Sequence, residues 1–358
     1  MTLECEWHPI GNLQSGEHAP AGEQPELPGS QNRLGRFVNT VVVKNETVEH
    51  QTILSRSAKC YTARQMGLAE HYPYRSAEAR AKFLASYDQI AEDWPIPSES
   101  RMVSTKFGET FVRIGGPLDA PPLVLLPGMT ATSLLWAPNI SALSAQYRTY
   151  AIDRNGDIGR STCTRRMADA EDAVNWLDEL FSGLAPGDRI NLAGLSFGGW
   201  LTAQYALRFP QRLRSVVLIA PGGILPVSPQ FVWRGLLLLT SRYFARRTIR
   251  WLMADLARTN PARIELSLNR LLLAIKSLRR VRPMPIKLLA DQELRALSVP
   301  ALYLVGEHEK IYPAAKAIER LKRVAPNIRT AMVPQAGHDL TIVQAERVNR
   351  LILDFLRQ

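Results

Sequence analysis

From residue 102 onward, short apolar segments alternate with longer stretches of helical periodicity, and few folds are compatible with this alternation. We expect strands at 102–107, 110–114, 123–126, 149–152, 190–193, 215–220, 301–305 and 330–333. The first two strands follow each other closely, whereas most of the later ones are separated by expected helices. This order is typical of an α/β fold with a mostly parallel eight-stranded sheet, an antiparallel edge and helices on both faces.

The expected helices have apolar residues at helical spacing. They lie at 76–94, 133–146, 168–182, 197–209, 313–324 and 341–356. Ser76 is a favourable N-cap for the first of them. Two late strands, 216–220 and 302–305, are continuously apolar, which is typical of strands that helices cover on both faces.

One long segment, residues 222–298, interrupts the alternation and contains no convincing strand. We expect at least two helices in it, at about 230–258 and 262–280, with apolar stripes along both. An insertion between two strands can cover the edge of the sheet where ligands bind. The expected parts of the chain are an N-terminal extension (1–75), a first core part (76–221), the insertion (222–298) and a second core part (299–358).

The N-terminal extension is expected to be partly disordered. Residues 1–35 are rich in Gly, Pro, Glu and Gln and offer few apolar side chains to bury. Short β-rich runs at 37–43 and 52–54 suggest two strands around a turn. We assign no function to this extension.

The formal net charge of +11 is concentrated in the insertion, which holds 14 basic and four acidic residues. The excess is therefore not a general property of the chain, and no nucleic-acid-binding motif accompanies it. Arg242, Arg246 and Arg250 recur every fourth residue and share one helix face, with Arg247 beside it. A basic rim of this kind over an apolar tunnel favours acidic amphiphiles, or a weak contact with an anionic membrane surface.

Three cysteines, Cys5, Cys60 and Cys163, are too few and too scattered for a disulfide scaffold or a zinc site. The first residues have neither a basic segment nor an apolar core typical of a secretion signal. The longest apolar run, 235–240, is far shorter than the roughly 20 residues that span a bilayer. We therefore expect a cytoplasmic protein.

The strongest motif is Gly194-Leu-Ser196-Phe-Gly198, a G-x-S-x-G sequence that ends an expected strand and begins an expected helix. A serine on so tight a turn is lifted clear of the sheet, and glycines are needed where side chains would collide with the strand and helix. The backbone N–H of Phe197, at the start of the helix, then lies beside the reacting carbon. This context favours a nucleophilic serine over a merely Gly-rich turn.

A nucleophilic serine needs a base, and the base needs a carboxylate to orient it. Four of the six histidines precede the predicted sheet, and of the other two His338 follows the last strand, as the chain order of a hydrolase triad requires. The loop after the strand at 301–305 offers two carboxylates, Glu307 and Glu309. We favour Glu309, and interpret His308 between them as an ordinary polar loop residue.

These motifs resemble those of the α/β-hydrolase fold superfamily, in its serine-nucleophile (esterase/lipase-like) branch with a helical cap. The resemblance covers about residues 102–358. Residues 194–198 match the nucleophile pattern and Gly337-His338 matches the histidine motif. Residues 306–309 match the acid loop, with Glu309 where the family usually has Asp.

The resemblance also implies an oxyanion hole in which the backbone N–H of Met129 joins that of Phe197. Pro127 departs from the family's usual His-Gly, whereas Gly128 is kept. The segment 153–161 is similar to a family loop that is usually structural. No cofactor and no metal is implied.

The expected activity is hydrolysis of a small or medium apolar carboxylic ester through a Ser196–His338–Glu309 triad and an acyl-enzyme. A serine at the nucleophile position argues against the related dehalogenases and epoxide hydrolases, which use Asp there. The same triad serves thioesterases, lactonases, C–C bond hydrolases and cofactor-free haloperoxidases, and the sequence does not separate these. A non-catalytic ligand-binding protein of the same fold is the alternative from another class. The oligomeric state is left open.

Overall fold

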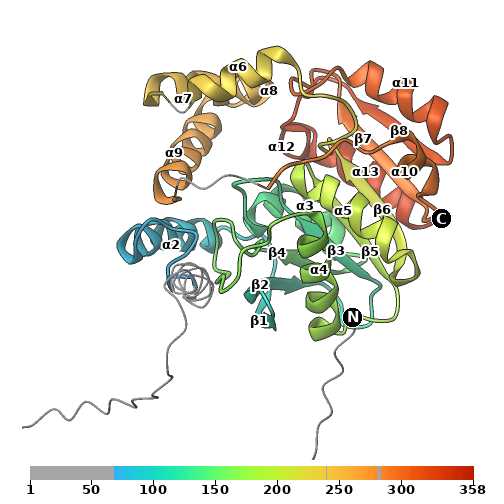
Figure 1. Ribbon diagram of the computed structural model, residues 1–358, viewed down its shortest axis with the longest axis horizontal. Coiled ribbons are helices and arrows are strands. Elements are labelled where there is room, and N and C mark those ends of the chain that lie inside the picture. Colours follow the sequence, from blue (N-terminus) through green and yellow to red (C-terminus); the bar gives the residue numbers. More distant parts are fainter. Residues whose placement is uncertain (1–67, 239, 280–283) are drawn as a thin grey trace, which may run out of the picture. The chain divides into compact units, whose positions relative to one another are not determined.

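The computed structural model describes residues 68–238, 240–279 and 284–358 (Figure 1). Most of the predicted N-terminal extension, including residues 1–35 and the two suggested strands, lies outside these residues. The first described helix is α2 (Ala77–Glu92), whose N-cap Ser76 accepts a hydrogen bond from the N–H of Ala79, as predicted. None of the described helices combines the length and the apolar character that crossing a bilayer requires.

The eight predicted strands form one sheet. They are β1 (Glu99–Thr105), β2 (Gly108–Gly115), β3 (Pro122–Leu126), β4 (Arg148–Ile152), β5 (Ile190–Leu195), β6 (Leu213–Ile219), β7 (Ala301–Gly306) and β8 (Ile328–Val333). Their order is β1-β2-β4-β3-β5-β6-β7-β8, with antiparallel pairing at β1–β2 and β2–β4 and parallel pairing elsewhere. The predicted mostly parallel sheet with an antiparallel edge is confirmed, and strand order reverses around β3 and β5, where a ligand site is expected.

Helices cover both faces of the sheet (Figure 1). One face packs against α4 (Ala170–Leu184), α5 (Phe197–Arg208) and α11 (Ala314–Val324), with Trp176 and Trp200 in its core. The other face packs against α3 (Ala137–Ser144) and α13 (Ala345–Leu356). Every residue of β7 and every residue of β6 except Arg214 is buried, as predicted for these two apolar strands when helices cover both faces.

Two expected core helices are divided. The segment at 133–146 is a 3₁₀ turn (Ser133–Trp136) followed by α3, and a Pro lies in the first turn of α3. The segment at 341–356 is α12 (Leu340–Val343) followed by α13, with a break at Gln344, whose ψ of 36° is not helical. Another 3₁₀ turn, Pro210–Arg212, joins α5 to β6.

The insertion is helical, as predicted, but the prediction of a single helix at 230–258 is wrong. Residues 230–258 form three helices: α6 (Pro229–Leu238), α7 (Arg242–Leu252) and α8 (Ala254–Thr259). Ser241 starts α7 as an N-cap, its hydroxyl accepting from the N–H of Phe244. The backbone of Met253, at φ −105° and ψ 44°, separates α7 from α8. The insertion continues with α9 (Pro261–Ser277) and a short α10 (Asp291–Ala296) that was not predicted.

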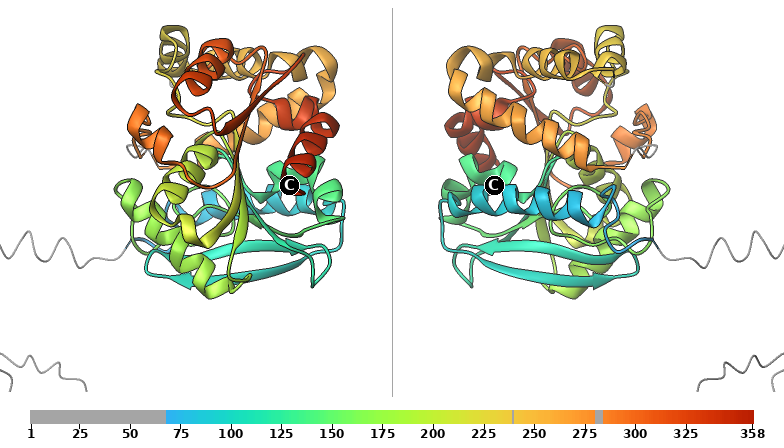
Figure 2. Two further views of the ribbon diagram at one scale, coloured as in Figure 1. Left: turned by 90° about the vertical axis from the view of Figure 1, so that its right-hand side faces the viewer. Right: turned by 90° about the vertical axis from the view of Figure 1, so that its left-hand side faces the viewer.

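The inserted helices have a small core of their own, built on Ile249, Leu256, Ile264, Leu268 and Leu272. The expected apolar stripe of α9 is therefore buried in part, whereas in the α6–α7 stripe Leu236 is 57% and Tyr243 65% exposed. Helix α9 also packs on α2, and the two helices lie side by side in Figure 1 and in the right-hand view of Figure 2. The attachment is continued by hydrogen bonds from Arg75 N–H to the carbonyl of Ser277 and from Arg279 N–H to that of Pro73.

Replacing Leu268 by Ala should lower the free energy of unfolding by about 2–5 kcal/mol, because it leaves a cavity in the core of the insertion. Urea unfolding followed by circular dichroism measures the change. Leu266→Ala is the matched control on the same helix, since Leu266 is 48% exposed. Equal effects of the two substitutions would contradict this description of the α9 packing.

Candidate active site

Ser196 lies on the turn between β5 and α5 in a conformation that side chains rarely adopt, with φ 56° and ψ −113°. Its N–H donates to the carbonyl of Ile219 at 2.8 Å, and its carbonyl accepts from the N–H of Trp200 at 3.0 Å. A non-glycine residue persists at positive φ only where its surroundings over-determine it. The strained serine predicted from the G-x-S-x-G motif is therefore present, and hydrogen bonds to β6 and α5 hold its backbone in place.

The two glycines of the motif are required by close backbone contacts. A Cβ on Gly194 would lie 2.2 Å from the carbonyl oxygen of Gly198, and a Cβ on Gly198 would lie 2.6 Å from that of Leu126. Real Cβ atoms do not approach oxygen so closely, and here the obstacle is backbone in both cases. The sequence-based reason for glycine at these positions is confirmed.

His338 and Glu309 come together from two loops at the same edge of the sheet. Nδ1 of His338 lies 2.8 Å from Oε2 of Glu309, whose side chain is fully buried. The other carboxylate oxygen accepts from the N–H groups of Lys310 and Ile311 at 2.8 and 2.9 Å. Both oxygens of this carboxylate are therefore engaged, and it is the Nδ1 side of the imidazole that faces it.

The alternative carboxylate, Glu307, is directed elsewhere. It is exposed and accepts a hydrogen bond from the N–H of Gln335 at 3.0 Å. Of the two carboxylates that the sequence offered, the structure therefore places Glu309 against His338.

The buried pair shifts both pKa values in the direction of the ion pair. Burial alone favours neutral His338, but the charge and hydrogen bond of Glu309, with help from Asp339, raise its pKa above the ordinary value of 6.5. Burial likewise favours protonated Glu309, but His338 and the two backbone donors lower its pKa. Mutual stabilisation of this kind is what a base–carboxylate pair needs when the imidazole becomes charged.

Ser196 and His338 line the same cavity, of about 870 Å³. Its walls come from α2, from the loop after β3, from α9 of the insertion and from α12. Many of the lining side chains are apolar, among them Ile90, Leu134, Leu135, Ile158, Phe231 and Leu271. The insertion therefore forms one wall of the cavity that holds the serine.

The amides expected to form an oxyanion hole lie at the start of α5 and after β3. Phe197 is the first residue of α5, where backbone N–H groups have no partner within the helix. Met129 lines the cavity, and its carbonyl accepts from the hydroxyl of Thr130. The N–H of Thr130 in turn donates to Asp157 at 2.8 Å. The loop at 153–161, predicted to be structural, thus holds the Met129 loop in place.

A set of contacts between the insertion and the catalytic loops was missed by the sequence analysis. Asp339 accepts hydrogen bonds from the N–H of Leu256 in α8, at 2.8 Å, and from that of Gly337, at 3.2 Å. Asp255, also in α8, contacts Nδ1 of His308 at 3.0 Å. His308 is therefore not an ordinary polar loop residue but a link between the insertion and the acid loop. Burial and the nearby Asp255 raise the pKa of Asp339.

The predicted arginine face of α7 does not form the rim of this cavity. Arg246 and Arg250 both pair with Glu265 of α9, and neither they nor Arg242 lines the cavity. The arginines that do line it are Arg263 and Arg270 of α9, which the sequence analysis did not single out.

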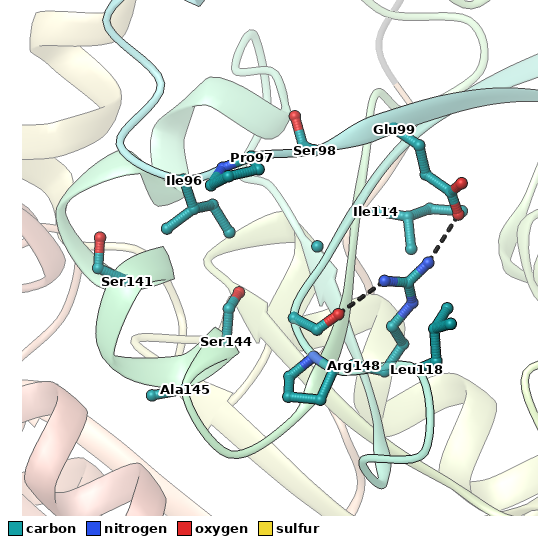
Figure 3. A pocket seen from close by; sticks show the side chains of 13 residues that line it. Ile96, Pro97, Ser98, Glu99, Ile114, Leu118, Ser141, Ser144, Ala145 and Arg148 are labelled. Carbon is teal, nitrogen blue, oxygen red and sulfur yellow. Dashed lines mark hydrogen bonds and ion pairs between the residues drawn. The ribbon is translucent and has the colours of Figure 1, made fainter.

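A second depression, of about 720 Å³, lies between β1, β2 and α3 (Figure 3). Its main polar feature is Arg148, which donates to Glu99 and to the carbonyl of Gly116, both at 2.7 Å. It contains neither a histidine nor a strained serine, and therefore offers no comparable chemistry. Within residues 68–238, 240–279 and 284–358, no cluster of His, Cys, Asp or Glu is suited to hold a metal ion.

Residues 123–351 match the Alpha/beta hydrolase family, a range that includes the strands from β3 to β8, the strained serine and the His338–Glu309 pair. The chain belongs to the alpha/beta hydrolase family. The fold and the family resemblance drawn from the motifs are thereby confirmed.

Among members of this hydrolase family, the chain is 35% identical over 290 residues to Carboxylesterase YbfK of Bacillus subtilis (strain 168), covering 79% of this chain and 96% of that protein. The crystal structure of that carboxylesterase matches with a TM-score of 0.71, over 78% of this chain and 99% of that one. The crystal structure of naproxen esterase (carboxylesterase NP) from Bacillus subtilis matches with a TM-score of 0.72 at 32% identity, over the same 78% and 99%.

Replacing Glu309 by Gln should lower the pKa of His338 from above 6.5 to below it, because burial then acts without the opposing carboxylate charge. NMR titration of the imidazole resonances measures this value. Glu307→Gln, two residues away and exposed, is the control and should leave the pKa unchanged. A pKa that falls equally in both variants would contradict the assignment of Glu309 as the partner.

Proposed function

We propose that this hydrolase cleaves carboxylic esters through a Ser196–His338–Glu309 triad and an acyl-enzyme. The observation that supports the proposal is the buried His338–Glu309 pair, 2.8 Å apart, in a cavity that also contains a serine held at positive φ. A nucleophile, its base and the base's orienting carboxylate are the three parts that acyl transfer requires. Two relatives, at 35% and 34% identity, are named as carboxylesterases, which supports the same reaction.

In the proposed mechanism, Ser196 Oγ attacks the ester carbonyl carbon while Nε2 of His338 accepts the hydroxyl proton. Glu309 stabilises the resulting imidazolium through Nδ1. The backbone N–H groups of Phe197 and Met129 stabilise the tetrahedral oxyanion, each by about 3 kcal/mol. His338 then gives its proton to the departing alcohol, and water that it activates hydrolyses the acyl-enzyme to release the acid.

The cavity supports a small or medium apolar ester as the substrate. Its volume of about 870 Å³ and its many aliphatic and aromatic walls are typical of sites that enclose a small apolar molecule. Thioesterases, lactonases, C–C bond hydrolases and cofactor-free haloperoxidases use the same triad. Their reactions therefore stay as alternatives for the same residues. A ligand-binding protein without turnover would have no use for a strained serine beside a buried base, so we favour an enzyme.

Ser196→Ala should abolish labelling by a fluorophosphonate probe and lower kcat for p-nitrophenyl butyrate by at least about 10⁴-fold, because the nucleophile is lost. Ser86→Ala is the matched control, since Ser86 lines the same cavity from α2 and is not part of the proposed triad. Thioester and lactone substrates in the same assay rank the alternatives. Labelling and turnover that survive in Ser196→Ala would exclude the proposed nucleophile.

We further propose a weak contact between the insertion and anionic membrane surfaces. Helix α6 exposes Trp233 and Leu236, and α7 exposes Arg242, Tyr243 and Arg247. Exposed aromatic and basic side chains together suit the boundary between lipid headgroups and acyl chains.

Sedimentation with vesicles tests this contact. The protein should bind vesicles that contain 30% phosphatidylserine, and Arg242→Gln/Arg247→Gln should weaken binding about 30-fold at low salt, at about 1 kcal/mol per arginine. Arg329→Gln/Arg350→Gln, which removes two exposed charges of the second core part, is the control. Equal binding to purely zwitterionic vesicles would refute the charge-based contact.

A further inference from the structure

Helix α9 directs a polar stripe into the otherwise largely apolar cavity. Arg263, Ser267 and Arg270 all line the cavity. Their spacing of i, i+4 and i+7 places them on one face of the helix, over two turns and about 10 Å. Two guanidinium groups and a hydroxyl therefore face the same space as Ser196 and His338.

The two cavity arginines have no ion-pair partner among the described residues, in contrast to three other arginines of the insertion. Arg246 and Arg250 pair with Glu265, and Arg258 pairs with Asp255. For Arg263 and Arg270, no carboxylate of the described chain lies within 4.0 Å. Arg263 is exposed, whereas Arg270 is partly buried beside the apolar binding space, where an unpaired cation costs solvation unless a ligand supplies the opposite charge.

The charges that line the cavity are divided between its α9 side and the loop of His338. The charged lining residues, besides His338, are Arg263, Arg270, Asp93 and Asp339. The carboxylate of Asp339 is already occupied by two backbone N–H groups. Partial burial lowers the pKa of Arg270. Asp93 opposes this shift through its negative charge, and the positive charge of Arg263 adds to it. On the α9 side of the cavity, two cations lie near the single carboxylate of Asp93, which leaves one positive charge there to be balanced.

We propose that Arg270, with Arg263 and Ser267, forms a carboxylate-binding subsite, so that the preferred esters carry a carboxylate at the end of an apolar chain remote from the ester carbon. The planar guanidinium of arginine binds a carboxylate through two parallel hydrogen bonds, and the hydroxyl of Ser267 is available as a third donor. The apolar walls between this stripe and Ser196 accommodate the chain. This inference rests on the proposed ester hydrolysis and names its substrate class.

Kinetics on matched ester pairs test the subsite. Monomethyl esters of the C5 to C9 dicarboxylic acids are compared with methyl esters of monocarboxylic acids of equal length. Arg270→Met should raise KM for the best half-ester about 10- to 100-fold, as expected for loss of a charge-assisted bidentate contact, and leave kcat/KM for the neutral ester within about twofold. Lys276→Met, an exposed substitution on the same helix, is the control.

A second substrate arm distinguishes the two ends of the ester. An ω-acetoxy carboxylate series carries the charge on the alcohol side, whereas the half-esters carry it on the acyl side. Selective loss of either series in Arg270→Met supports the subsite and assigns the side of the ester that it binds. Equal effects of Arg270→Met on neutral and anionic esters of both series would overturn the proposal.

Equilibrium binding separates failure of the subsite from failure of the proposed reaction. Calorimetry with the Ser196→Ala protein measures Kd for the half-ester without turnover, and Ser196→Ala/Arg270→Met should bind it at least 10-fold more weakly. Unchanged Kd would overturn the subsite even if neutral esters are hydrolysed. A 10-fold loss of affinity in a protein that hydrolyses no ester would instead support the subsite and refute the proposed function.

Discussion

The structure depends on the close approach of backbone at the turn after β5. Gly194, Gly198 and the carbonyl of Leu126 meet there at distances that leave no room for a side chain. The turn holds Ser196 at positive φ, and the parallel order of β3, β5 and β6 brings the necessary loops to one edge of the sheet. A substitution that relaxed this contact would separate β5 from α5 and remove both the exposed serine and the helix start beside it.

The rest of the site is built on loops that leave neighbouring strands at the same edge. Glu309 follows β7, His338 follows β8 and Met129 follows β3, so residues far apart in the sequence meet at the ends of the sheet. The loop after β4 supports this arrangement from behind, since Asp153 accepts hydrogen bonds from the N–H groups of Ser133 and Arg160. Burial raises the pKa of Asp153, although these donors oppose the shift.

Much of the core was predictable from the sequence because its strands are short, apolar and separated by amphipathic helices. The positions of Ser196, His338 and Glu309 followed from chain order, whereas the choice of Glu309 over Glu307 depended on a loop conformation that spacing alone does not determine. The breaks around α7 were missed because no Gly or Pro marks them. The capping hydroxyl of Ser241 marks the start of α7, and the non-helical backbone of Met253 marks its end.

Contacts between the insertion and the core were beyond sequence reasoning for a different reason. His308 meets Asp255, which is 53 residues earlier, and Asp339 meets Leu256 across 83 residues. No periodicity or motif in the sequence marks either pair, because each contact depends on how the inserted helices pack against the core. The cavity-lining arginines of α9 were missed likewise, since their orientation depends on the packing of α9 against α2.

The anchoring of α8 joins the insertion to the two loops that carry His338 and Glu309. The hydrogen bond from Leu256 to Asp339 joins the insertion to the residue next to His338, and Asp255 joins it to the residue next to Glu309. Lifting α8 would release both loops at once. The insertion therefore belongs to the framework that keeps these two loops in place relative to each other, in addition to forming a wall of the cavity through α9.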